Sequence, residues 1–115
     1  MDIEIKNNLL DIEYAIIEIE RFFDETSKDF ETYGNEPAEI KRSVETHIET
    51  IADALKHIFE RQPSIQLSNA QKIIEAENKI IYDHNSVTDE MIWSIIINYL
   101  ETLKVEVQQM LQQNS

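Results

Sequence analysis

Glu77 and His84 are two residues whose types and spacing could do acid–base chemistry in this chain. They stand seven positions apart, and on an α-helix positions i and i+7 lie on roughly the same face. A carboxylate beside an imidazole can orient the ring, and an imidazole transfers protons near neutral pH. One hypothesis is therefore that His84 is a general base oriented by Glu77. The alternative is an exposed or helix-capping histidine, because histidine is favourable near the C-terminus of a helix.

The sequence offers little for binding a metal or a cofactor. Di-metal sites in helical bundles use Glu-x-x-His pairs, but Val44, Ala54 and Ile81 stand three positions before the three histidines. The chain has no cysteine, which excludes thiolate metal sites and a cysteine nucleophile. Its single glycine cannot build a phosphate-cradling loop. We expect no cofactor and no metal.

The charge balance is strongly acidic. The chain has ten Lys and Arg residues and 23 Asp and Glu residues, which gives a formal net charge of −13. Nucleic-acid-binding proteins normally gain affinity from a basic surface, so this chain should repel RNA at long range unless its cations gather in one groove. We expect no DNA binding. No apolar run approaches the roughly 20 residues that span a bilayer, and the acidic N-terminus is unlike a signal peptide, so we expect a cytoplasmic protein and no membrane partner.

Apolar residues recur at alternating steps of three and four, which is the pattern of amphipathic helices. This periodicity predicts helices over residues 3–29, 37–61, 69–83 and 89–112. Pro37 suits the first turn of the second helix, and Ser68 with Gln71 forms a possible capping box before the third. The expected fold is all-α, an antiparallel up-down four-helix bundle, in a single domain of residues 1–115.

Some apolar residues exceed what a four-helix core needs. Leu10, Ile17, Ile95 and Ile97 lie beside the main stripes, and Tyr99 lies on the stripe of the last helix. We interpret the surplus as the interface of a homodimer. Trp93 is expected in the core or at that interface, with a platform for stacking a nucleobase as the alternative.

The segment from Ala76 to Trp93, AENKIIYDHNSVTDEMIW, resembles the signature of HepT-type HEPN proteins. These are small all-α ribonuclease toxins that pair with a minimal nucleotidyltransferase antitoxin. Their motif, Arg-Asn-x-x-x-His-x-Tyr, closes the third helix and precedes an acidic turn and a fourth helix with a Trp. The triplet Ala52-Asp53-Ala54 is also similar to the end of their second-helix pattern. The likeness runs from about Leu9 to Leu111.

The resemblance implies a metal-independent RNA endonuclease whose catalytic positions are Glu77, Asn78, Tyr82 and His84. In the family the Arg stabilises charge on the scissile phosphate and the His transfers protons. Glu77 has the wrong charge for the first task, and the phenol of Tyr82 is a poor replacement for an imidazole. With Glu77 facing the cleft, we expect weak or absent cleavage. Arg42 and His47 also fit a loose Arg-x4-His pattern, which we interpret as coincidence because the family does not carry its site there.

The resemblance also implies partners. We expect a homodimer in a toxin–antitoxin pair with a nucleotidyltransferase (MNT) antitoxin, which in the family adds AMP to the motif Tyr. Here His84 holds that acceptor position, and Tyr82 could accept AMP instead. The alternative is a non-catalytic interaction module that binds a nucleotidyltransferase or a nucleotide. RNA is the expected substrate under the first hypothesis only.

Overall fold

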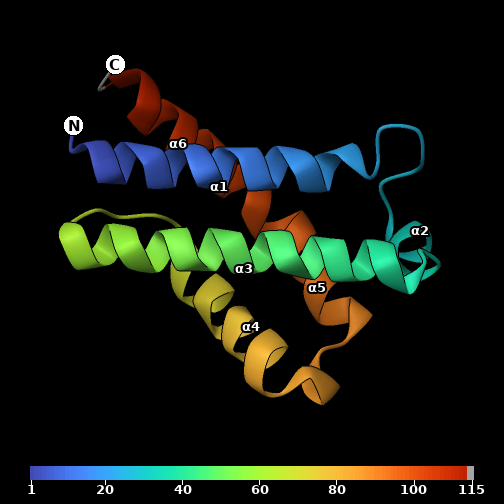
Figure 1. Cartoon of the computed structure of the whole chain (residues 1–115). Helices are drawn as coiled ribbons and strands as arrows, with labels where there is room; N and C mark the ends of the chain where they lie inside the picture. Colours follow the sequence, from blue (N-terminus) through green and yellow to red (C-terminus); the bar gives the residue numbers. More distant parts are fainter. Residues whose placement is uncertain (114–115) are drawn as a thin grey trace.

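Four main helical segments form the molecule, and a wide loop leads from the first of them to the short helix before the second (Figure 1). The computed structural model describes residues 1–113. The segments are α1 (Ile3–Arg21), α3 (Ala38–Arg61), α4 (Ala70–Tyr82) and a last helix made of α5 (Asp89–Ile95), η2 (Ile96–Leu100) and α6 (Glu101–Gln113). A short α2 (Phe30–Gly34) and a 3₁₀ turn, η1 (His84–Ser86), lie between them. The described residues contain no strand, and the all-α prediction is confirmed.

The core forms mainly where α1 and α3 lie side by side and antiparallel (Figure 1). The apolar stripes predicted for these helices are buried: Leu9, Ile12, Ile16 and Ile19 on α1, and Val44, Ile48, Ile51, Leu55 and Ile58 on α3. Burying one such side chain contributes about 1.5–3 kcal/mol. The helix α4 packs against α3, so α3 supports its position.

The first helix is shorter than predicted. It ends at Arg21 rather than near residue 29. The next backbone N–H groups, of Phe22 and Phe23, bond to carbonyls only three residues back, in tighter turns. Asp29 then caps α2 by accepting the N–H of Thr32 at 2.8 Å. A residue that caps a new helix has a non-helical backbone, so the chain must leave α1 before it.

The predicted capping box of Ser68 and Gln71 is also wrong. Asn69 is the N-cap of α4, with a left-handed φ of 63°, a conformation that asparagine tolerates well. Ser68 instead donates its backbone N–H and its hydroxyl to the carboxylate of Glu106, at 2.8 and 2.6 Å. These bonds tie the start of α4 to α6.

The last helix contains one π turn, η2, between two α-helical halves. The sequence places Tyr99 on the core stripe with Ile96 and Leu103. The structure buries Leu100, at 3% exposure, and leaves Tyr99 only half-buried. A π turn bonds each residue to one position further along the chain than an α turn, so it shifts which residue faces the core.

The apolar surplus is smaller than expected. Ile95 is buried in the molecule's own core and Ile17 is partly buried, whereas Leu10 and Ile97 are exposed. The interpretation of Ile95 as a surplus surface residue was therefore wrong. None of the helices in residues 1–113 is both long and apolar enough to cross a membrane.

Candidate functional site

The four predicted site residues lie at the C-terminal half of α4 and in η1, but they do not converge. Glu77 is 1% exposed, and its side chain is turned to α3. Tyr82, the last residue of α4, is 82% exposed. Asn78 and His84 are exposed. Glu77 therefore points into the molecule, whereas the other three side chains lie at the surface.

Glu77 belongs to a charged cluster with two residues of α3. Lys56 Nζ lies 2.7 Å from Glu77 Oε1 and 3.3 Å from Asp53 Oδ1. Burial and the neighbouring Asp53 raise the pKa of Glu77, while Lys56 opposes that rise. The pKa of Asp53 is lowered, because it shares a hydrogen bond with Glu77 and lies beside Lys56. Of the two carboxyl groups, Glu77 is therefore the one that takes up a proton first as the pH falls.

Two predictions about Glu77 are corrected by this geometry. Its carboxyl group does not face an open cleft, because Lys56 and Asp53 cover it. It does not orient His84 either. The backbone of Asp83, with φ −148° and ψ 55°, leaves the helix before His84 is reached. The rule that i and i+7 share a face holds only within a helix.

His84 is instead held by Glu45 of α3. His84 Nε2 lies 2.9 Å from Glu45 Oε1, and Arg42 Nη1 lies 3.1 Å from the same oxygen. The Glu45 side chain is 10% exposed, whereas those of Arg42 and His84 are 58% and 57% exposed. A nearly buried carboxylate thus holds a guanidinium and an imidazole at the surface. We call Arg42, Glu45 and His84 the Glu45 group.

The sequence motifs do not include this group. Arg42 fits only the loose Arg-x4-His pattern with His47, and Glu45 belongs to no motif. A spacing of three on one helix could have suggested the pair of Arg42 and Glu45. The contact of Glu45 with His84 joins residues 39 positions apart, and no local pattern signals it.

An aromatic and charged layer lies close to the Glu45 group. The Trp93 ring stacks on Tyr33, with centroids 6.2 Å apart, and meets the edge of Phe23. Lys41 of α3 pairs with Asp89 of α5 at 2.9 Å. Burial, Asp89 and Glu45 all raise the pKa of Tyr33. Trp93 therefore packs against the core, as predicted, rather than offering a free face to a nucleobase.

The Glu45 group has the residue types for acid–base chemistry on a phosphate ester. An imidazole held by a carboxylate can transfer protons, and a guanidinium can stabilise charge on a phosphoryl oxygen. Among residues 1–113, no three His, Asp or Glu side chains are arranged to hold a metal ion.

A family model described as HepT-like, ribonuclease HepT-like, matches residues 12–110, which is well over half of the chain. No curated protein and no solved structure matches it.

Proposed function

Because the chain belongs to the HepT-like ribonuclease family, we propose that it is a slow, metal-independent RNA endonuclease that works through the Glu45 group. The family's residues at positions 77 and 82 are exchanged here for Glu and Tyr. Arg42 and His84 supply the same two side-chain types from α3 and η1.

One observation carries this proposal: a single oxygen, Oε1 of Glu45, contacts both Arg42 and His84. When His84 donates Nε2–H to that oxygen, Nδ1 keeps its lone pair and can take up a proton. The 2′-hydroxyl of RNA gives that proton to Nδ1 as its oxygen forms a bond to phosphorus. The bond from phosphorus to the 5′-oxygen breaks, and water returns a proton to the leaving oxygen. Arg42 stabilises the charge that builds on the phosphoryl oxygens.

The acidity of the chain limits how well it holds RNA. With a net charge of −13, repulsion of phosphates is strongest at low ionic strength, where screening is weakest. Glu77 is not the source of this repulsion, because it is buried beside Lys56. We expect weak RNA affinity that does not fall steeply with added salt, unlike normal phosphate binding.

We place the contacts with partner proteins at the end of α4. Ile81 and Tyr82 are apolar neighbours there, 50% and 82% exposed. This exposed surface supports a homodimer. The family membership supports a toxin–antitoxin pair with a nucleotidyltransferase, which we propose acts in the cytoplasm. Tyr82 is the better candidate for AMP addition, since its ring is open to solvent whereas Nε2 of His84 is already bound to Glu45. The same surface supports the second candidate function, a non-catalytic module that binds such a partner.

The test is cleavage of a mixed-sequence RNA in the presence of a chelator. His84→Ala should slow cleavage by about 10²-fold or more, the usual contribution of a general acid or base. His57→Ala is the matched control, because His57 is an exposed histidine of α3 outside the Glu45 group. Arg42→Ala should also slow cleavage, with Arg21→Ala as its control, because Arg21 is exposed and pairs with a glutamate three positions away.

Equal rates for His84→Ala and the wild type would refute the endonuclease proposal. Complete inactivity of the wild type, together with a stable complex with a minimal nucleotidyltransferase, would instead establish the interaction module.

A further inference from the structure

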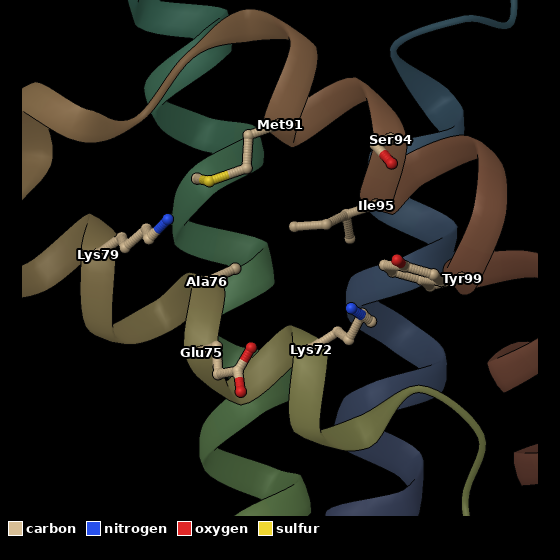
Figure 2. A pocket seen from close by; sticks show the side chains of 8 residues that line it. All are labelled: Lys72, Glu75, Ala76, Lys79, Met91, Ser94, Ile95 and Tyr99. Atoms are coloured by element: carbon tan, nitrogen blue, oxygen red, sulfur yellow. The ribbon is translucent and has the colours of Figure 1, made fainter.

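A pocket of about 230 Å³ lies between α4 and the last helix, and the proposed function does not use it. Figure 2 shows its lining side chains. Ala76, Met91 and Ile95 supply an apolar wall. Polar groups surround that wall on both helices: Lys72, Glu75 and Lys79 on α4, and Ser94 and Tyr99 opposite them.

The lysines of this pocket differ from most cations of the chain. Six of the ten Lys and Arg residues form ion pairs with carboxylates. Within residues 1–113, no ion pair is formed by Lys6, Lys28, Lys72 or Lys79. Two of these four line one small pocket, in a protein with 23 acidic residues. Their ammonium groups are therefore available to a ligand.

The π turn supplies the last of the five polar residues, Tyr99. It brings Leu100 to the core in place of Tyr99, and Tyr99 lines the pocket instead. Single π turns inside α-helices occur frequently at functional sites. The structure thus combines uncompensated cations, two hydroxyl groups and a backbone irregularity at one apolar pocket.

We propose that this pocket binds a phosphate monoester with a small apolar body. Lys72 and Lys79 lie seven positions apart, so their side chains share one face of α4 and can approach the phosphate from two sides. Ser94 and Tyr99 offer hydroxyl donors to its oxygens. Met91 and Ile95 contact the apolar body. The pocket lies below the usual 300–1,000 Å³ of drug-sized sites, so the body must be small.

Glu75 is the acidic residue of the lining, and its charge allows a further test. It stands between the two lysines on α4 but forms no ion pair with either. Its carboxylate repels an anion and holds the affinity down. Removing that charge should therefore tighten binding, whereas removing a lysine should weaken it. None of these residues belongs to the Glu45 group, so the proposal is independent of RNA cleavage.

The experiment is an amide-resonance NMR titration of the full chain with phenyl phosphate. Saturable shifts should concentrate in α4, α5 and η2. The double variant Lys72→Gln with Lys79→Gln should bind about tenfold more weakly. Lys6→Gln with Lys28→Gln is the matched control, because it removes the same charge from two unpaired lysines outside the pocket, and its affinity should stay within about twofold of wild type. Glu75→Gln should bind more tightly.

Inorganic phosphate and benzyl alcohol test the two halves of the ligand. Each should bind more weakly than phenyl phosphate, because each lacks one set of contacts. Three results would overturn the proposal: shifts that do not saturate, equal weakening in the two lysine double variants, or unchanged affinity in Glu75→Gln.

Discussion

Lys56 Nζ lies 2.7 Å from Oε1 of Glu77, and the Glu77 side chain is 1% exposed. Under the motif resemblance proposed above, position 77 of α4 would carry a cation. Here α4 supplies the carboxyl group, and α3 supplies the cation. The cation therefore lies on α3 and not on α4, the helix on which the motif resemblance would put it.

A charge exchange tests this pair. Glu77→Arg alone should reduce the free energy of unfolding by about 3 kcal/mol, because it leaves two cations together at a buried position. Lys56→Glu with Glu77→Arg should recover most of that loss. Urea unfolding of the wild type, both single variants and the double variant gives the coupling energy. A coupling near zero would show that Lys56 and Glu77 do not interact in solution.

The raised pKa of Glu77 gives stability a defined pH dependence. Its folded-state pKa lies above the ordinary glutamate pKa of 4.5, so the stability from its protonated form is present below pH 4.5 and is lost as pH rises through the folded-state pKa. Glu77→Gln cannot ionise, and its amide can still donate to Asp53. Its stability relative to the wild type should therefore grow as pH rises above 4.5, then level off. Melting temperatures across this range provide the measurement, and a difference independent of pH would contradict it.

Tyr33 carries a buried hydroxyl with no hydrogen-bond partner in the described part of the chain. A buried unsatisfied polar group is costly, so Tyr33→Phe should raise the free energy of unfolding by about 1 kcal/mol. Tyr14→Phe is the control, since Tyr14 is 63% exposed and should change little. Destabilisation by Tyr33→Phe would show that the hydroxyl is hydrogen-bonded in solution.

Restoring the family motif should create stronger RNA cleavage. Glu77→Arg with Tyr82→His supplies the guanidinium and the imidazole of the family motif. Lys56 would repel the new arginine, so it is replaced by glutamate, which can pair with that arginine. The triple variant with Lys56→Glu should cleave RNA at least about 10²-fold faster than the wild type. A folded triple variant without any gain would show that the surroundings of the motif no longer support catalysis.

The exposed end of α4 should control self-association. Ile81→Asp with Tyr82→Asp should convert a dimer into a monomer in sedimentation at micromolar concentration, because two charges would enter an apolar interface. Val105→Asp is the comparison, since Val105 is an exposed apolar residue of α6, 42% exposed. Dissociation by Val105→Asp alone would show that the interface lies on α6. A monomeric wild type would refute the dimer proposal.

The fold was predictable where a continuous apolar stripe along one face of a helix determines which residues are buried. The stripe of α3 meets this condition, and its expected residues are buried. Helix ends were less predictable, because Asp29 and Ser68 act through partners that a hydrophobic pattern does not contain. Tyr99 was misplaced because a π turn changes the helical period that the prediction assumes.

The site was less predictable than the fold. A glutamate is normally placed at the surface, and Glu77 is buried because Lys56 of another helix accompanies it. The partner of His84 was wrong for a related reason: the turn at Asp83 breaks the helical register, and the imidazole reaches Glu45 on a distant segment. Both relationships depend on how α3 and α4 pack.

The π turn divides the last helix into two α-helical halves, α5 and α6. Lys104 of α6 binds Glu20 of α1 at 2.9 Å, and Lys41 of α3 binds Asp89 of α5 at 2.9 Å, so each half is anchored to a different helix. The π turn holds one more residue than an α turn, so the extra residue is accommodated locally and both halves keep their ion pairs. Deleting Asn98 should therefore restore an uninterrupted α-helix with both ion pairs intact, and only the lining of the pocket around Tyr99 would change.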